Sequence, residues 1–381
     1  MRGAGPLAFL LAVAGCGPQG PAEPPQARPV LLQHQRLLTD GEYERALAAW
    51  RQGKKSFEQR ASYLKARKLD PAFFMPGLGW ADIVTNPFRE FLAEEPSRTR
   101  VDQLRLHTQA FTGFSLHLFR YTRGVEVPPE VVPVEAWDKQ HRQRIPDRSV
   151  RAFEQLRATL PAKYVVKVPR VMGEVGWNVA GHVVNWDLVP YQESIEVLHR
   201  SGVLAWLERR AAAGERITVV EIGSGYGGFA YYLTEILPGA SYWLCDLPES
   251  LPVAAMYLSV TRPALWKGVY PDCPGGCGGA GLVGLANYRF EELGGELRKV
   301  DLVINMMSLS EMPEVQIDYY GRKVSALLGD DGIFFEQNYD NRKLGFSNSK
   351  EVLPRHFKAN TDLGESAYRG HGHLWANRPE V

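Results

Sequence analysis

The chain has 381 residues, enough to bury a large core and to form two domains or one elaborated domain. Apolar residues make up 45% of it and aromatic residues 11%, which is typical of a globular protein and excludes a disordered chain. Lys and Arg number 44 and Asp and Glu 43, so no overall field favours a nucleic-acid partner. After residue 20 no apolar run approaches the roughly 20 residues that a membrane-spanning helix needs.

The first 30 residues have the features of a leader and a tether. Met1 and Arg2 precede an apolar stretch over residues 6–14, which ends near Cys16 in the order Val-Ala-Gly-Cys. This order resembles a bacterial lipoprotein signal, in which Cys16 would be lipidated and become the new N-terminus. Residues 17–29, rich in Pro, Gly and Gln, would then form a flexible tether. The alternatives are an incorrectly assigned start codon and an apolar leader that is never processed.

Residues 31–160 are predicted to form a mainly helical N-terminal region. The segment 40–66 indicates one or two helices, and 135–160 indicates another. Between these segments, residues at three- and four-residue steps define one apolar helix face: Val101, Leu104, Thr108, Phe111, Phe114, Leu118 and Tyr121. The segment 164–169 is predicted to be a strand, and it opens a second domain over residues 161–381.

From about residue 191 the pattern alternates regularly between helices and strands. After a helix over 191–210, we expect strands over 217–222, 241–245, 285–290, 300–305 and 333–337, helices over 227–237, 249–260, 291–297 and 311–328, and a late strand over 373–376. This alternation predicts an α/β fold in which parallel strands are joined by right-handed crossovers.

The loop between the first of these strands and its helix is rich in glycine. Gly223, Gly225 and Gly227 follow a strand whose next-to-last residue is Glu221, and the next strand ends on Asp246. Glycines allow the backbone to pass close to a ligand where any Cβ would intrude. The spacing is not the G-x-G-x-x-G of dinucleotide enzymes, which aims a helix at a pyrophosphate. An acid beside the glycines suits a cationic ligand, and S-adenosylmethionine has a sulfonium, an ammonium and no phosphate.

This pattern resembles the first motif of class I S-adenosylmethionine-dependent methyltransferases. The resemblance implies a Rossmann-like fold: a seven-stranded, mostly parallel sheet with an antiparallel late strand, here preceded by the helical N-terminal region. It also implies S-adenosylmethionine as the cofactor. Three further segments, 174–185, 246–258 and 301–313, make residues 165–378 similar to a family of sugar O-methyltransferases from bacterial polysaccharide and secondary-metabolite clusters. That narrower resemblance implies a sugar hydroxyl as the methyl acceptor.

Ligands of such sheets bind beyond the carboxyl ends of the strands, which indicates the cofactor-binding residues. These are Glu221, Gly223, Gly225, Gly227, Asp246, Leu247 and Asn305. The glycine loop and Glu221 would face the methionine end, and Asp246 has the position of the acid that binds the ribose in the family.

Methyl transfer to a hydroxyl needs alignment of three atoms and removal of the hydroxyl proton. Glu311 is the first candidate for this proton transfer, although an acid at a helix start also favours the helix dipole. Glu336 is the second candidate, with a structural hydrogen-bonded pair as the alternative. His182 is a third, since imidazole titrates near neutrality, and His371 and His373 share this property. Mg²⁺ held by Glu311, Glu336 or Asp340 is chemically possible, but no metal-ligand spacing supports it.

The segment before the sheet is rich in aromatic and amide side chains and is expected to form a lid or to contact the substrate. The candidates are Glu174, Trp177, Asn185, Tyr191 and Gln192, together with Ser308 after the fourth strand.

The cysteines indicate little chemistry. Cys245 is expected in the core of the second strand. Cys273 and Cys277 allow a local disulfide or half of a metal site, and an ordinary loop is the preferred interpretation because no second pair exists.

The expected partner is a small-molecule or glycan acceptor, with a membrane involved only if Cys16 is lipidated. We expect a cytoplasmic protein, because S-adenosylmethionine is made there, with a lipid anchor in the envelope as the alternative. Two other functions remain open: N- or C-methylation of another small molecule, and an envelope-anchored lipoprotein with a degenerate, non-catalytic methyltransferase fold.

Overall fold

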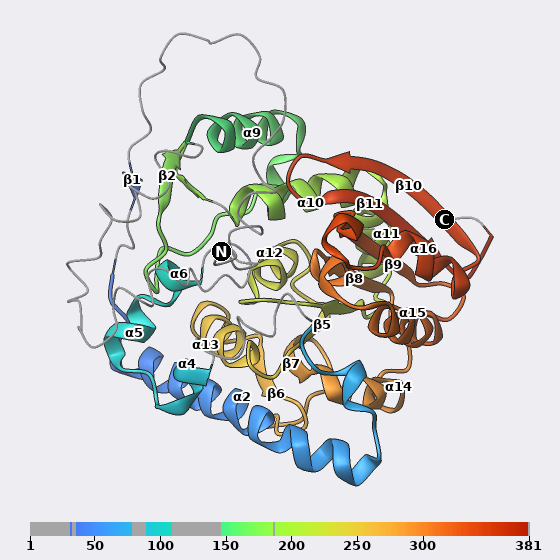
Figure 1. Ribbon diagram of the computed structural model, residues 1–381. Helices are drawn as coiled ribbons and strands as arrows, with labels where there is room; N and C mark the ends of the chain where they lie inside the picture. The colour runs from blue at the N-terminus through green and yellow to red at the C-terminus, as the bar shows by residue number, and fades with distance from the viewer. Residues whose placement is uncertain (1–30, 33–35, 78–88, 109–145, 186, 380–381) are drawn as a thin grey trace, which may run out of the picture.

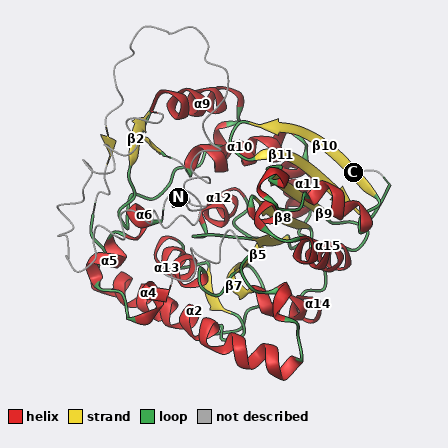
Figure 2. Ribbon diagram, viewed as in Figure 1, coloured by secondary structure: helices red, strands yellow, loops and turns green. Residues whose placement is uncertain are grey.

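The computed structural model describes residues 31–32, 36–77, 89–108, 146–185 and 187–379. In this part of the chain the centre of the molecule is an eight-stranded sheet with the order β10-β11-β9-β8-β4-β5-β7-β6 (Figures 1 and 2). Its strands are β4 (Thr218–Ile222), β5 (Ser241–Asp246), β6 (Trp266–Val269), β7 (Gly281–Ala286), β8 (Leu302–Met306), β9 (Ile333–Asn338), β10 (Ala359–Ser366) and β11 (Gly370–Ala376).

Strand direction defines the fold class. The strands from β6 to β9 pair in parallel, whereas β11 is antiparallel to both of its neighbours, β9 and β10. The late strand β11 therefore lies between β9 and β10 and is antiparallel to both, near the edge of the sheet, as expected. The Rossmann-like methyltransferase fold is confirmed, and β6 extends the expected seven strands to eight on the edge beside β7.

The central strands are buried on both faces. All residues of β4, β5, β7, β8 and β9 are buried, and this explains their continuous apolar runs, since helices cover a parallel sheet on both sides. One core cluster joins one face to α10 (Leu188–Arg200), α11 (Val203–Ala212) and α12 (Gly228–Ile236). The other joins the opposite face to α15 (Glu314–Leu328). The short helix α14 (Leu293–Glu296) and the helix α16 (Ser349–Val352) complete this side.

The N-terminal region packs directly against the sheet domain through one long helix. α2 (Asp40–Arg67) begins with a capping box of Thr39 and Glu42 and lies along α13 (Leu251–Thr261), as Figure 1 shows. A Cβ on Gly53 would lie 2.7 Å from Pro252 Cα, so glycine permits the close approach of the two helices. The predicted boundary between residues 160 and 161 stays a prediction.

A second, smaller sheet precedes the main one. It consists of β1 (Leu31–Leu32), β2 (Gly176–Val179) and β3 (His182–Val184), and α9 (Pro146–Thr159) packs against it. Shorter helices, α4 (Arg89–Ala93), α5 (Arg98–Asp102) and α6 (Leu104–His107), connect α2 to this region.

Several predicted elements differ from the structure. The segment 164–169 is not a strand: a 3-10 turn over Ala162–Tyr164 precedes an irregular segment. The helix predicted over 191–210 is two helices, because Gly202 takes a positive φ of 80° between α10 and α11. The third strand ends at Ala286, and the aromatic residues after it form a 3-10 helix over Asn287–Glu292.

Other predictions fall partly or wholly on residues outside the described ranges. These are the leader with Cys16, the helix face between Phe111 and Tyr121, and the first part of the helix over 135–160, of which Pro146–Thr159 is confirmed. Where the structure describes the chain, it contains no helix whose length and apolar character would suit a membrane span.

Candidate functional site

The carboxyl ends of β4, β5, β8 and β9 meet at one edge of the sheet, and the glycine turn lies there. Gly223 donates its N–H to the Cys245 carbonyl of β5 (2.8 Å) and has a φ of +80°. A Cβ on Gly223 would collide with the Ser308 hydroxyl, which follows β8. Gly227 also has a positive φ, of 83°, and α12 begins one residue later. The turn therefore requires glycine for backbone conformation and for space.

Asp246 is bound to this glycine turn. Its carboxylate accepts hydrogen bonds from the Gly225 N–H (2.6 Å), the Leu247 N–H (2.6 Å) and, more weakly, the Ser224 hydroxyl (3.5 Å). The side chain is at the limit of burial, with 9% exposure for the residue. Burial raises the pKa of Asp246 to about 6, although the hydrogen bonds act in the opposite direction. The acid predicted to bind a ribose is thus held in place at the strand end.

Glu221 is the more deeply buried acid of the pair. Its carboxylate accepts a hydrogen bond from the Tyr242 hydroxyl (2.8 Å) and is 1% exposed. Burial raises the pKa of Glu221 to about 8, and the nearby Asp246 charge adds to this. Because a cation favours the ionised acid, binding of a positively charged ligand here would release a proton.

A chain of amide side chains joins the ends of three strands. Asn305 donates to the Ile222 carbonyl (2.9 Å) and also contacts the Ser308 hydroxyl. Asn338 donates to the Asn305 side-chain oxygen (3.0 Å) and accepts from the Ser310 N–H (3.1 Å). Between these groups Met307 has a φ of 73°, which a non-glycine residue rarely adopts. The side chains of Asn305 and Ser308 therefore hold the backbone at the end of β4 in place, since both contact the Ile222 carbonyl.

Glu336 lies beside a cavity at the end of β9. The cavity has a volume of about 210 Å³, and its lining includes Glu336, Asn338, Asp340, Ser349, Lys350 and His371. The buried Glu336 carboxylate accepts hydrogen bonds from Asn338, from the Ser349 hydroxyl (3.1 Å) and from the Trp375 indole (3.4 Å). Burial raises the pKa of Glu336 above its ordinary value. Because Asn338 lines the cavity and contacts Asn305, the cavity adjoins the strand ends.

The other two catalytic candidates lie elsewhere. Glu311 is half-buried at the end of the 3-10 turn over Ser308–Glu311, which leaves β8. His182 lies on β3 of the small sheet, where its ring packs 5.0 Å from the Phe153 ring, and burial lowers the pKa of His182. The structure does not bring His182 together with the residues at the strand ends.

The three acids considered for Mg²⁺ do not form a cluster of ligand atoms among the described residues. Asp340 instead forms an ion pair with Arg342 (2.6 Å). The structure therefore offers no support for Mg²⁺ at Glu311, Glu336 and Asp340.

The predicted lid residues mostly make structural contacts. Gln192 holds the backbone of the lead-in segment through the Tyr164 carbonyl (2.6 Å) and the Val166 N–H (3.1 Å). Trp177 is buried on β2, where it pairs with Leu31 and Val184. These two residues fix the segment and leave Tyr191 as the candidate that reaches the glycine turn.

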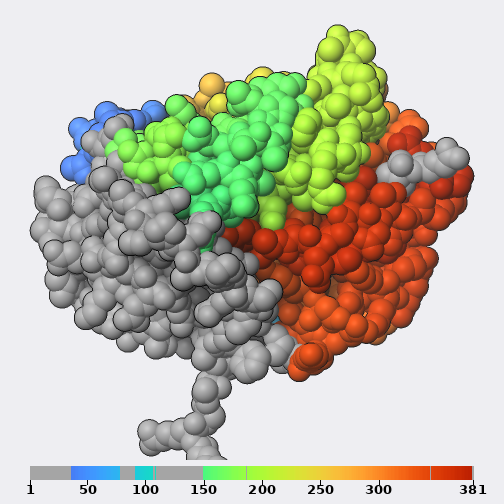
Figure 3. All heavy atoms as spheres, turned by 90° about the horizontal axis from the view of Figure 1, so that it is seen from above, coloured from blue at the N-terminus to red at the C-terminus, as the bar shows by residue number. Residues whose placement is uncertain are grey.

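Tyr191 packs against the glycine turn itself. Its ring lies 6.1 Å from the Tyr226 ring and 5.8 Å from the Phe229 ring, measured between centroids. A Cβ on Gly228 would lie 2.7 Å from the Tyr191 ring. Figure 3 shows the lead-in surface (green) beside the surface of the late strands (red). The Tyr191 ring thus lies against the glycine turn, and its role as a lid stays a prediction.

A buried arginine that the sequence did not indicate joins the lead-in segment to the glycine turn. Arg105, which is 1% exposed, forms ion pairs with Glu174 (2.8 Å) and Asp187 (2.7 Å). Its guanidinium lies 3.6 Å from the centre of the Tyr226 ring, and Asn185 completes the network by donating to Glu174 (2.6 Å). Burial disfavours the charge of Arg105, but the two carboxylates outweigh it and raise its pKa.

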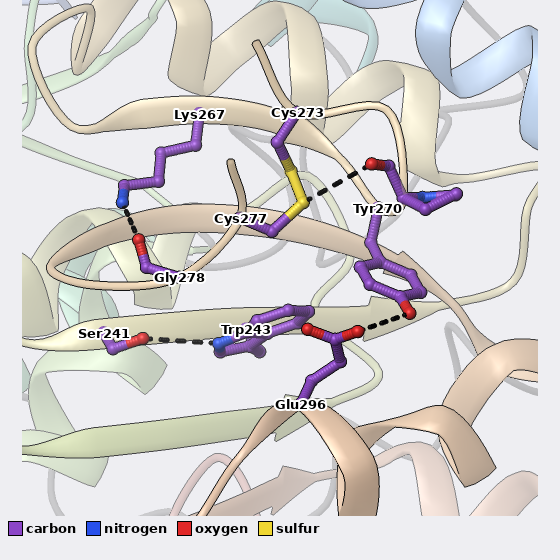
Figure 4. Close-up of a disulfide and its surroundings, with 9 residues drawn as sticks. Ser241, Trp243, Lys267, Tyr270, Cys273, Cys277, Gly278 and Glu296 are labelled. Atoms are coloured by element: carbon purple, nitrogen blue, oxygen red, sulfur yellow. Dashed lines mark hydrogen bonds between the residues drawn. A yellow bond between two sulfur atoms is a disulfide. The ribbon is translucent and has the colours of Figure 1, made fainter. Parts of the chain in front are cut away.

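Cys273 and Cys277 form a disulfide in the loop between β6 and β7, so the preferred interpretation as an ordinary loop was wrong (Figure 4). The loop lies over β5, where the Trp243 ring is 5.7 Å from the Tyr270 ring and Tyr270 donates to Glu296 (3.0 Å). Cys245 is buried in β5, as predicted.

Comparison with known proteins finds similarity to solved structures alone. No protein-family model matches the sequence, and no curated protein matches it. Similar solved structures include the PH0226 protein from Pyrococcus horikoshii (14% identity, 50% of this chain and 93% of that one, TM-score 0.34). They also include an O-methyltransferase family protein from Burkholderia thailandensis (11% identity, 51% of this chain and 61% of that one, TM-score 0.34). A third is magnesium protoporphyrin IX methyltransferase from Synechocystis with bound S-adenosylhomocysteine (15% identity, 51% of this chain and 87% of that one, TM-score 0.33).

These identities and TM-scores are low, so the fold class rests on the strand order of this chain.

Proposed function

We propose that the protein is an S-adenosylmethionine-dependent methyltransferase that methylates a hydroxyl group. The observation that supports this most directly is Asp246, fixed by the Gly225 and Leu247 N–H groups at the end of the second core strand. Beside these two bonds and the weak contact with the Ser224 hydroxyl, its carboxylate has one lone pair free for a ribose hydroxyl, and a second ribose hydroxyl would replace the Ser224 contact. The backbone of the glycine turn would contact the methionine portion, with Glu221 as the acid nearest to its ammonium.

When bound, the donor supplies a methyl group that its sulfonium already activates. The protein must then orient the acceptor oxygen and remove its proton. Glu336 is the proposed proton acceptor, because it lines the cavity and its raised pKa brings it closer to neutrality. Glu311, in the loop after β8, is the second candidate for this role.

We propose a sugar, or a similarly hydroxyl-rich molecule, as the acceptor. The lining of the cavity beside Glu336 includes carboxylates, amides, the hydroxyls of Tyr339 and Ser349, and the cations of Arg342 and Lys350. Such groups bind hydroxyls and offer little to a purely apolar ligand. An N- or C-methyltransferase with the same donor site is the alternative.

Binding of S-adenosylhomocysteine, measured by calorimetric titration, tests the donor site. The Asp246→Ala variant should bind about 1–3 kcal/mol more weakly, because a buried charged acceptor is lost. Asp331→Ala is the matched control, since Asp331 is an exposed acid in the turn before β9. Equal affinity in wild type and Asp246→Ala would remove the ribose assignment, and absence of binding would remove the methyltransferase proposal.

Transfer of a radiolabelled methyl group to a small-metabolite extract tests the proton acceptor. Glu336→Gln should bind S-adenosylhomocysteine like the wild type and lose most of its transfer. Glu311→Gln is its counterpart: if only this variant loses transfer, the assignment passes from Glu336 to Glu311.

We propose the lid role for Tyr191. The other candidates hold the lead-in segment in place through their contacts: Glu174, Trp177, Asn185 and Gln192. If a Tyr191→Ala variant that keeps its fold retains both donor affinity and turnover, the lid role is wrong.

We propose a cytoplasmic location, since the donor is made there. The Cys273–Cys277 disulfide favours the alternative, an anchor at Cys16 in the envelope, because disulfides persist in oxidising compartments. Mass spectrometry of the native protein separates the two: an unmodified N-terminus with reduced cysteines supports the cytoplasm, and a lipidated Cys16 supports the envelope.

A further inference from the structure

The hairpin of β10 and β11, at one edge of the main sheet in Figure 1, holds two histidines and an aspartate close together. His371 and His373 are two residues apart on β11, so their side chains share one face of the strand. Asp362 lies directly opposite His373 in the register of β10. One potential ligand atom from each of the three residues lies within 4.8 Å of those from the other two.

The three side chains are in contact with one another. The His371 Nε2 lies 2.5 Å from the Asp362 Oδ1, and the two imidazole rings stack with centroids 4.8 Å apart. Side-chain exposure increases from His373, which is buried, through His371 to Asp362, which is exposed. One side of the group is therefore open to solvent, so an ion can reach it.

His373 supplies a second, independent indication. Its Nδ1 lies 3.0 Å from the Asn360 side-chain oxygen, which can only accept, so Nδ1 holds the proton and Nε2 has a lone pair. The residue is 3% exposed, and among the described residues Nε2 has no hydrogen-bond partner. A neutral imidazole whose other nitrogen donates to an oxygen is the usual form of a metal ligand.

We propose that Asp362, His371 and His373 bind one divalent transition-metal ion, with zinc as the best-matched ion. Two imidazoles and a carboxylate are a common ligand set for zinc and for other first-row transition metals. Three protein ligands leave a coordination position for water or another small ligand. The ion would fasten the edge strand β10 to β11, and His371 also lines the cavity beside Glu336. The site does not depend on the proposed methyltransferase activity.

The chain offers a matched control for an ordinary histidine–aspartate pair. His356 Nε2 lies 2.9 Å from Asp318 Oδ1. Within the described residues no third ligand joins that pair to form a potential metal cluster. If the Asp362 group were only such a pair, both would respond to metal in the same way.

The test is titration of the tag-free, chelator-treated full-length protein with Co²⁺, which reports its coordination in visible absorption. We expect intense bands typical of low coordination number at one equivalent, and their loss when Zn²⁺ displaces Co²⁺. His371→Ala and Asp362→Ala should weaken metal binding by about tenfold or more, as the loss of one ligand requires. His356→Ala should bind like the wild type.

A stability measurement protects the conclusion from folding defects. His371 and Asp362 are not buried, so their variants should unfold at the same temperature as the metal-free wild type. Zn²⁺ at a fixed concentration should raise the unfolding temperature of the wild type and of His356→Ala by the same amount and raise that of both ligand variants less. The proposal is overturned if Co²⁺ gives only weak, adventitious binding, or if the ligand variants bind it as tightly as His356→Ala does.

Discussion

The ionisation of Asp246 should set the pH dependence of donor binding. A carboxylate that accepts two ribose hydroxyls must be ionised, and burial raises the pKa of Asp246 to about 6. With that pKa, about 9% of the free protein has the ionised acid at pH 5 and about 91% at pH 7. The ionisation of Asp246 should therefore contribute an increase of about tenfold, or about 1.4 kcal/mol, in affinity for S-adenosylhomocysteine between these pH values.

Calorimetric titration at pH 5, 6 and 7 measures this change. Repeating each titration in buffers of different ionisation enthalpy counts the protons released on binding, which should be most numerous at pH 5. Asp246→Asn is the control, because its amide does not titrate. Any slope that remains in this variant belongs to Glu221, whose pKa burial raises to about 8. Equal wild-type affinities at pH 5 and 7, or the full wild-type slope in Asp246→Asn, would refute the reasoning.

The same two acids give opposite signs for stability and for binding. A folded-state pKa above the unfolded value stabilises the protein below the unfolded pKa, and this contribution is lost as pH rises through the folded pKa. Asp246 and Glu221 should thus destabilise the ligand-free protein progressively from about pH 4 to their values of about 6 and about 8. The increase in unfolding temperature caused by S-adenosylhomocysteine should grow over the same range.

Three further predictions concern the architecture of the site. Gly223→Ala should lower the unfolding temperature and abolish donor binding. Adding Ser308→Gly to this variant should remove the collision with the Ser308 side chain but not the cost of the positive φ, which is about 1–2 kcal/mol. If the double variant regains none of the lost stability, the collision is not the cause. Arg105→Met should lower the free energy of unfolding by about 3–5 kcal/mol in a denaturant titration, because the buried carboxylates of Glu174 and Asp187 lose their cation. A loss below about 1 kcal/mol would mean that these carboxylates become protonated at little cost. Reduction of the Cys273–Cys277 disulfide should lower the free energy of unfolding by about 2 kcal/mol or less in the same titration, because the loop it closes is short. A larger loss would show that the disulfide also stabilises structure outside this loop.

The disulfide and the β7 boundary show where local patterns reached their limit. Cys273 and Cys277 were recognised as a pair that could bond, but their spacing alone did not distinguish a bond from a loop. The strand predicted over 285–290 is β7, which begins at Gly281 and ends at Ala286. Glycines precede and begin this strand, so its start has no apolar pattern, and the aromatic residues after it are strand-like in composition. The disulfide and the start of β7 lie in or beside a loop that packs over β5, where the Tyr270 ring is 5.7 Å from the Trp243 ring, and this contact is not encoded locally.

The sequence by itself determined the strand, glycine turn, helix and second strand that place Gly223, Gly225 and Asp246 together. These residues lie close in the chain, and their hydrophobic periodicity and φ requirements are local properties. Only the tertiary structure decided which distant groups join them. Arg105 reaches Glu174 and Asp187 across 69 and 82 residues, and Asp362 faces His373 because the bulge after it shifts the register of β10. Such pairs depend on packing and strand register, which no local pattern encodes.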